Sequence, residues 1–419
     1  MCFLIVVPSV VLAAGNSTAV DAEKTINKPK VLKVAIYADG GTHRGHLRRL
    51  VKEFEQKNPN IDVHLMATRG IGEYNDKVEY WIRSGSGPDL IYWYGGQRLN
   101  QFDRKGKVTD LSAFWSKNNL HKDFPLALRQ ASMHKGRMLA IPITYYFWAL
   151  YYHEPSIKAM GLDLPTNWVE LMYGCTSLRE QGIDLFTFGS QTAWATHGWF
   201  DYFNLRVNGL DFYRGLLAGK IAYTDVRVHT ALSYWKQLLE SDCFNANHGS
   251  YNLWQSFPRI YHGLSAMSLI DGVPQGTAQE RRQGLRLMPF PSIVEGIPRY
   301  TVAPVNVFFV PAYVEPSPEL DTLLLYIASA DFQSEFNKSI FRPPAHIKGK
   351  TYGDSRTQAM QDAIRDSAGG IQYLDRDTEY AFAKEVPAIL VSFLEHRDIH
   401  RTTAQLEALR QKVFIETDK

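Results

Sequence analysis

The chain has few cysteines, little net charge and, after its first residues, no long hydrophobic run. Only 3 of its 419 residues are cysteines, so a disulfide-rich scaffold is excluded. Beyond residue 14 no segment approaches the roughly 18 consecutive apolar residues of a membrane-spanning helix, so we expect the mature protein to be soluble. Lys and Arg total 46 against 43 Asp and Glu, and a net charge of +3 disfavours a dedicated nucleic-acid binder.

The common catalytic motifs are also missing. There is no G-x-S-x-G, no G-x-x-x-x-G-K-[ST] and no H-E-x-x-H, and Gly70-Ile71-Gly72 lacks the third glycine of a dinucleotide-binding loop. Two histidine pairs have ligand-like spacing, but no Cys or Glu with metal spacing accompanies either pair: His43 with His46, and His396 with His400. We therefore expect no metal, no cofactor and surface roles for these histidines. Carboxylate pairs for glycoside hydrolysis come together only in the fold, so a secreted glycoside hydrolase remains an alternative.

The amino-terminal segment has the features of a secretory signal peptide. Residues 2–14 are uncharged and largely apolar, too short to span a membrane, and a polar stretch follows them. We expect residues 1–19 to be removed on export and the mature protein to reside in the periplasm. A buried strand is the alternative for this segment. The remaining cysteines, Cys175 and Cys243, are an even pair in an oxidising compartment, and we expect them to form a disulfide or to lie close enough to do so.

The hydrophobic pattern indicates an α/β fold. The composition, 45% hydrophobic, supports two or three domains at roughly 100–200 residues each. Strands are expected at 31–37, 61–65 and 88–93, with helices between them, so the sheet should be wound and mainly parallel. Two β-rich stretches, 138–143 and 148–152, follow each other without room for a crossover helix. They suggest a passage between domains.

Several motifs, in order along the chain, resemble those of the bacterial family 1 extracellular solute-binding proteins, which include the maltose-binding protein. Residues 74–90 contain a helix followed by the Gly-x-x-Pro-Asp start of a strand, at Gly85–Asp89. Residues 136–142 and 149–152 are similar to the hinge motif of that family, and the similarity continues through 165–168. His153 stands where the family usually has Asn or Asp. The resemblance covers roughly residues 30–350.

The resemblance implies a two-lobed periplasmic binding protein fold. It implies a first lobe of 30–143 plus 285–330 and a second lobe of 147–283 plus 335–419. The chain would cross between them near 143–149, 284–300 and 330–340. It further implies that a sugar or oligosaccharide binds between the lobes and is delivered to the permease subunits of an ABC transporter. We expect a monomer that is not an enzyme; a receptor for a membrane sensor kinase is an alternative with the same fold.

Loops that follow the expected strands carry aromatic and polar residues together. A sugar has an apolar C–H face and a rim of hydroxyl groups, so its site pairs flat aromatic rings with carboxylate or amide groups. Trp148, at the hinge, is expected to be a stacking platform. The candidate ligand-binding residues are Tyr37, Asp39, Trp93, Tyr94, Gln97, Tyr146, Trp148, Trp194, Trp254 and Asp271.

Other tryptophans fit a structural role, because they lie on the apolar faces of expected helices or beside their caps. Trp235 is the clearest case, on the helix that starts near Asp225. The identity of the sugar stays open at this point. Arg44, Arg69 and Arg98 near the first-lobe loops leave an acidic sugar among the alternatives.

Overall fold

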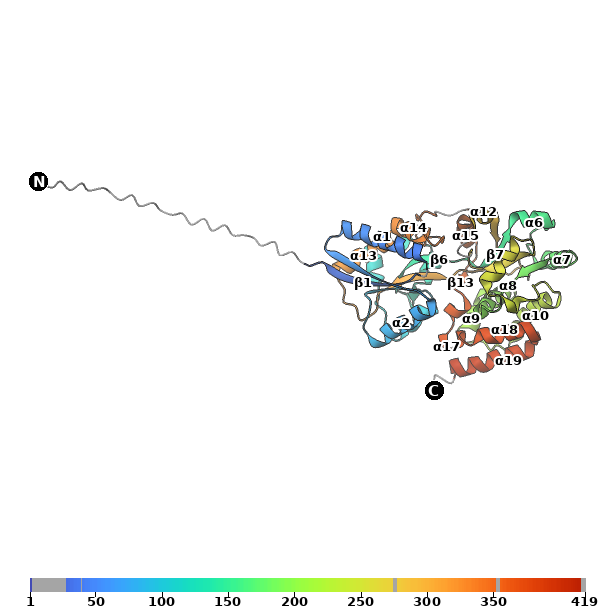
Figure 1. The fold of residues 1–419 in the computed structure, drawn as a ribbon. Coiled ribbons are helices and arrows are strands. Elements are labelled where there is room, and N and C mark those ends of the chain that lie inside the picture. Colours follow the sequence, from blue (N-terminus) through green and yellow to red (C-terminus); the bar gives the residue numbers. More distant parts are fainter. Residues whose placement is uncertain (2–27, 39, 274–276, 352–354, 416–419) are drawn as a thin grey trace.

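The protein folds into two lobes that lie side by side (Figure 1). The computed structural model describes Met1 and residues 28–38, 40–273, 277–351 and 355–415. Residues 2–19 of the expected signal peptide, which was predicted to span residues 1–19, and the candidate ligand residue Asp39 lie outside the described residues. Each lobe has its own hydrophobic core: one is built from residues of 32–145 and 305–345, and the other from residues of 147–302 and 360–406.

The first lobe contains a five-stranded sheet in the order β2-β1-β3-β12-β6. The strands are β1 (Lys30–Tyr37), β2 (Ile61–Thr68), β3 (Leu90–Tyr94), β6 (Ala140–Tyr145) and β12 (Val305–Phe309). β1 pairs in parallel with β2 and β3, as expected for strands joined by helices. β12 is antiparallel to both β3 and β6, because it enters this sheet from the second lobe.

The second lobe contains a four-stranded sheet in the order β10-β7-β9-β8. Its strands are β7 (Ala149–His153), β8 (Asp184–Thr187), β9 (Ser265–Ile270) and β10 (Leu285–Met288). Only β8 and β9 are parallel; β7 is antiparallel to β9 and β10. Both sheets are therefore mixed where we expected mainly parallel ones, and in each lobe a strand that arrives through the hinge runs against its neighbours.

Helices surround both sheets (Figure 1). Those of the first lobe are α1 (Gly41–Lys57), α2 (Ile71–Ser84), α3 (Gln97–Arg104), α4 (Ser112–Lys117), α5 (Leu126–Gln130), α13 (Pro318–Ala328) and α14 (Ala330–Lys338). The second lobe begins with α6 (Glu154–Met160), α7 (Trp168–Arg179), α8 (Thr196–Val207), α9 (Gly209–Leu217), α10 (Val226–Glu240), α11 (Leu253–Ser256) and α12 (Gln279–Gly284). It ends with α15 (Ser355–Arg365), α16 (Leu374–Asp377), α17 (Tyr380–Ala383), α18 (Val386–His396) and α19 (Ile399–Arg410). Within the described ranges, no helix combines the length and apolar character needed to cross a membrane.

Two short strand pairs lie at the edges of the lobes. β4 (Met133–His134) and β5 (Arg137–Met138) form a hairpin in the first lobe. β11 (Thr301–Val302) pairs in parallel with β13 (Gly370–Ile371) on the second-lobe side of the hinge.

The lobe boundaries differ from those that the resemblance implied. The first crossing lies between Tyr145, which belongs to the first core, and Phe147, which belongs to the second. β10, at 285–288, pairs with β7 in the second sheet, so the return crossing is at 302–305 instead of 284–300. α14 packs into the first core, so the last crossing comes after residue 345 instead of at 330–340. Hydrophobic periodicity does not distinguish these cases, because either core would accept the same apolar faces.

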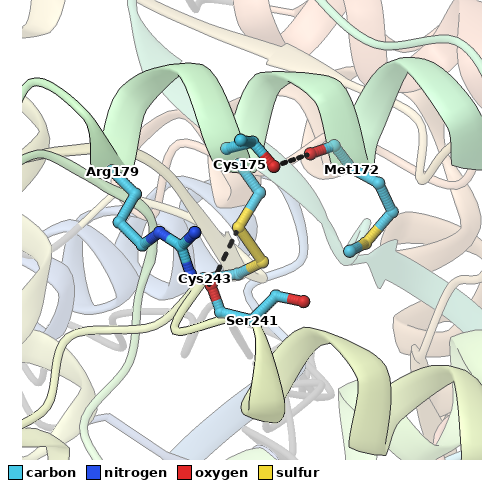
Figure 2. The surroundings of a disulfide bond; sticks show 6 residues. Met172, Cys175, Arg179, Ser241 and Cys243 are labelled. Atoms are coloured by element: carbon cyan, nitrogen blue, oxygen red, sulfur yellow. Dashed lines mark hydrogen bonds between the residues drawn. A yellow bond between two sulfur atoms is a disulfide. The ribbon is translucent and has the colours of Figure 1, made fainter.

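The second core contains a disulfide between Cys175 of α7 and Cys243, which follows α10 (Figure 2). Both residues are buried. The bond connects residues 68 positions apart and fastens α7 to the segment after α10. The buried face of α10 contains Trp235, as the periodicity predicted.

Loss of this disulfide should destabilise the second lobe. In the chain-entropy model, a closed loop of this length contributes about 4 kcal/mol by restricting the unfolded chain. Denaturant unfolding of the Cys175→Ser, Cys243→Ser double variant should show that loss, and reduction of the wild type should reproduce it. Two free thiols in non-reduced, denatured protein would contradict the bond itself.

Candidate ligand site between the lobes

Two crossing segments, 145–149 and 302–305, run against each other at the boundary of the lobes. The backbone N–H of Tyr146 donates to the carbonyl of Pro304 at 2.8 Å, and that of Trp148 donates to Val302 at 3.0 Å. Such antiparallel pairing fixes the direction in which each side chain of the two segments points. Tyr146 therefore stands between the lobes.

An asparagine connects the tyrosines of the first lobe to an arginine of the second. The amide nitrogen of Asn306 donates to the hydroxyl groups of Tyr92 and Tyr146, both at 2.7 Å. Its Oδ1 accepts from Nη1 of Arg376 at 2.9 Å. The Arg376 guanidinium also lies over the rings of Tyr94 and Tyr146, 4.5 Å and 5.3 Å from their centroids. Asn306 thus holds Arg376 against two aromatic rings.

A second arginine crosses the boundary in the opposite direction. Arg342, of the first lobe, donates from Nη1 to the backbone carbonyl of Asp271 at 2.6 Å and from Nη2 to its Oδ2 at 3.3 Å. The same guanidinium lies 3.8 Å from the centroid of the Tyr146 ring. We call Tyr94, Tyr146, Asp271, Asn306, Arg342 and Arg376 the interlobe cluster.

Three aromatic rings adjoin this cluster on the second-lobe side. Trp148 stacks on Tyr373 with a centroid distance of 4.7 Å and an interplanar angle of 15°, and Trp194 meets Trp148 edge-on at 6.0 Å. The Tyr373 hydroxyl donates to the carbonyl of Trp194 and accepts from the N–H of Gly198, both at 3.0 Å. A Cβ at Gly198 would lie 2.9 Å from Trp148 Cε3, so α8 approaches this ring closely because residue 198 is glycine. Trp194 stays 39% exposed.

Several buried polar atoms beside these rings have no protein partner among the described residues. They are Oδ1 of Asp271, Oδ1 of Asp375 and both ring nitrogens of His197. Burial lowers the pKa of His197 to about 4, while the nearby Asp375 acts in the opposite direction. At neutral pH this imidazole is uncharged, with one N–H donor and one acceptor nitrogen. Buried polar groups are normally hydrogen-bonded, so the arrangement suits a ligand that both donates and accepts.

The structure brings five of the predicted residues together: Tyr94, Tyr146 and Asp271 in the interlobe cluster, and Trp148 and Trp194 beside it. Trp148 differs from the expected exposed platform. Its ring is 2% exposed because Tyr373 and α8 cover it, so it supports Trp194 and Tyr373 from behind.

Trp93 does not join the cluster. It is 1% exposed and stacks on Phe102 in the first core, at a centroid distance of 5.6 Å. Successive side chains of a strand point to opposite faces of the sheet. Since the site takes Tyr94 and the Tyr92 hydroxyl, Trp93 points to the other face.

The remaining predicted residues lie elsewhere or outside the described chain. Tyr37 ends β1 and packs near Tyr74, at 6.3 Å between ring centroids. Gln97 accepts a hydrogen bond from Arg104 and lines a separate cavity of about 610 Å³ on the lobe boundary, with Asn100 and Arg214. Trp254, on α11, is 39% exposed, and within the described residues it has no ring contact with the cluster.

Sequence reasoning missed the basic and amide members of the site. Asn306 lies inside a buried strand, and Arg342 and Arg376 come from segments with no recognisable motif. His197 follows Trp194 by three residues in a polar turn, and that proximity to a candidate aromatic was the only available signal.

The paired histidines lie in two different places, and His43 is buried where we expected a surface role. His43 bonds to Ser339 Oγ at 2.7 Å and His46 to the carbonyl of Glu335 at 2.6 Å, so both fasten α1 to α14. His396 and His400 line a surface pocket of about 550 Å³ together with His229. In the part of the chain that the structure describes, no group of three or more His, Cys, Asp or Glu residues has the geometry to hold a metal ion.

Two α/β lobes joined by several crossings, with a polar and aromatic cluster between them, define a two-lobed binding protein. The family model for bacterial extracellular solute-binding proteins matches residues 40–255, and the chain belongs to this family.

Known proteins are similar to this chain at low sequence identity. An uncharacterized ABC transporter extracellular-binding protein of Pyrococcus horikoshii is 21% identical over 332 residues, which cover 77% of this chain and 73% of the relative. A probable sugar-binding periplasmic protein of Rhizobium meliloti is 27% identical over 169 residues, 39% of each chain. The crystal structure of the bacterial solute receptor AcbH, described as preferring β-D-galactopyranose exclusively, superposes with a TM-score of 0.82 at 19% identity. It covers 92% of this chain and 100% of the receptor.

The neutral state of His197 predicts a pH dependence of stability. An unfolded histidine has a pKa near 6.5, whereas the folded state lowers it to about 4. The unfolded chain therefore takes up the proton first, and this residue should remove roughly 3 kcal/mol of stability as the pH falls from 6.5 to 4. In denaturant unfolding, the wild type should lose that much more than His197→Gln between pH 7 and 4. His64→Gln, a change at an exposed residue of β2, should follow the wild-type profile. Equal pH profiles for wild type and His197→Gln would contradict the prediction.

Proposed function

We propose that this protein is the exported, periplasmic receptor of a carbohydrate ABC importer. It binds a sugar or oligosaccharide between its lobes as a monomer and delivers it to the permease subunits. It acts by binding and does no chemistry on the sugar. Closure of the lobes around the ligand is a hinge motion about the crossing segments.

The observation that carries the proposal is the set of unpartnered polar atoms beside exposed aromatic surface. Asp271 and Asp375 each offer a carboxylate oxygen that accepts hydrogen bonds, and His197 offers a donor and an acceptor. A sugar hydroxyl group both donates and accepts, so adjacent hydroxyls match this set. The 39% exposed ring of Trp194 is the flat apolar surface that suits the C–H face of a sugar.

The relatives support the same class of ligand. The name of the Rhizobium meliloti protein refers to sugars, and the AcbH receptor is described as preferring β-D-galactopyranose. The aromatic and polar cluster of this chain lies between its two lobes, and ligand sites of proteins occur preferentially at such domain interfaces, which supports the proposal.

A thermal-shift screen of mono- and oligosaccharides tests the proposal directly. A ligand at 100 times its Kd adds about 2.7 kcal/mol of stability, which is easily detected. The same mixtures, analysed for hydrolysis products, separate a receptor from a glycoside hydrolase. Stabilisation without turnover supports the receptor; turnover overturns it.

Trp194→Ala should weaken sugar binding while leaving the fold intact. Loss of an aromatic anchor should cost about 1–3 kcal/mol, or roughly tenfold or more in Kd. The melting temperature should change little, because the side chain is partly exposed. Calorimetric titration with the best ligand of the screen measures the effect.

Trp254→Ala is the matched control, because this tryptophan is equally exposed but lies outside the cluster. It should retain wild-type affinity. Equal losses in the two variants would mean that Trp194 is no ligand platform.

A further inference from the structure

Three arginines bridge the two lobes around the proposed sugar site, and each packs on a tyrosine ring. Arg98 of the first lobe lies over Tyr380 of the second, 4.4 Å from the ring centroid. Arg376 of the second lobe lies over Tyr94 and Tyr146 of the first, and Arg342 connects Tyr146 to Asp271. Arg98 also lies 5.4 Å from the centroid of Tyr94. Guanidinium groups and tyrosine rings therefore alternate along the lobe boundary.

These cations are unequally compensated. Arg342 has an ion pair with Asp271, with 3.3 Å between Nη2 and Oδ2. No such pair is seen for the other two: among the described residues, no carboxylate oxygen lies within 4 Å of the Arg98 or Arg376 guanidinium. Within the described chain, the one hydrogen bond of the Arg376 guanidinium goes to a neutral amide, that of Asn306. Glu379, the nearest acidic residue to Tyr380 in sequence, is paired with Arg104.

Burial acts to lower the pKa of Arg376, but the nearby groups Tyr146, Asp375, Tyr94 and Asp271 act to raise it. A cation at such a position that has no directly bonded anion is still costly. Arg98 is only 5% exposed, and a buried cation without an anion loses hydration that the protein does not replace. Tyrosine rings recover part of this loss through cation–π interactions, but they leave the N–H edges of the guanidinium unused. Arg376 as a whole residue is half-buried.

We propose that the ligand is an acidic sugar, a uronate, whose carboxylate binds Arg376 with Arg98 nearby. This inference rests on the proposed function and narrows its ligand class. A planar carboxylate accepts two parallel hydrogen bonds from a guanidinium edge, which a hydroxyl group does not. The unpartnered oxygens of Asp271 and Asp375 then accept from the hydroxyls of the same sugar. In this arrangement the carboxylate of the sugar binds Arg376, and the hydroxyl groups of the same sugar bind the carboxylates of Asp271 and Asp375.

Calorimetric titration with a matched pair of ligands tests the charge alone. Galacturonate and its methyl ester share every hydroxyl group and differ in the anionic group, and glucuronate with its methyl ester is the second pair. Short oligomers of each acid and ester extend both pairs. The wild type should bind the acid at least tenfold more tightly than the ester, and this gap should shrink as salt concentration rises.

Arg376→Gln should remove that difference in affinity. Its Kd for the acid should rise at least tenfold, and its Kd for the ester should change less than twofold. Arg376→Lys retains the charge but not the paired donors, and should fall between wild type and Arg376→Gln. The matched control is Arg401→Gln, which removes one positive charge from an exposed position of α19 and should behave as wild type. The ligand pairs test the wild type itself, so the proposal stays testable even if Arg376→Gln fails to fold.

Each outcome decides between the two proposals. Equal or tighter binding of the esters, or of galactose and glucose, overturns the acidic-sugar inference and leaves the sugar receptor standing. An acid preference that persists in Arg376→Gln overturns the assignment to Arg376. If neither acids nor neutral sugars bind, the proposed function fails as well.

Discussion

The structure depends on the pairing of two backbone segments where the chain crosses between lobes. The backbone N–H groups of Tyr146 and Trp148 donate to the carbonyls of Pro304 and Val302, respectively. The chain enters one lobe at one end of these paired segments and the other lobe at the opposite end. The pairing sets the register of β6 against β12 in one lobe and the start of β7 in the other. As a result, Tyr146 and Asn306 meet at the boundary, and the rest of the interlobe cluster assembles on them.

Local features of the fold could be predicted because they depend on short-range periodicity. Six apolar residues at helical spacing in α10 are all buried, and β1, β2 and β3 lie close to their expected positions. The lobe boundaries could not be predicted in the same way. Whether β10 or α14 joins one core or the other depends on where the chain returns through the hinge, which is a long-range property.

The candidate site was predicted in part, for a related reason. Tyr94, Tyr146 and Asp271 end strands or lie in the hinge, and loops at such positions commonly carry binding residues. Trp93 shows the limit of this argument. A shift of one residue along β3 moves a side chain to the opposite face of the sheet. Because this strand is buried on both faces, its sequence pattern does not reveal which face is turned toward the site. The arginines come from three segments separated by more than 30 residues each, so only the tertiary fold unites them.

The treatment of charge differs between the lobe interiors and the lobe boundary. Inside the first lobe, buried Asp103 is paired with both His134 and Arg137, and in the second lobe Glu407 is paired with Arg410. At the boundary, Arg98 and Arg376 lie over aromatic rings and have no ion pair with a carboxylate of the described residues. In the same part of the chain, Asp271 and Asp375 each retain a buried oxygen without a protein partner. Opposite charges that lie this close to each other normally form ion pairs, because pairing offsets part of the hydration that both groups lose. Arg342 pairs with Asp271, whereas Arg376 bonds to the neutral amide of Asn306. Under the proposal, Arg376 and the Oδ1 atoms of Asp271 and Asp375 then serve a ligand that bears both an anionic group and hydroxyls.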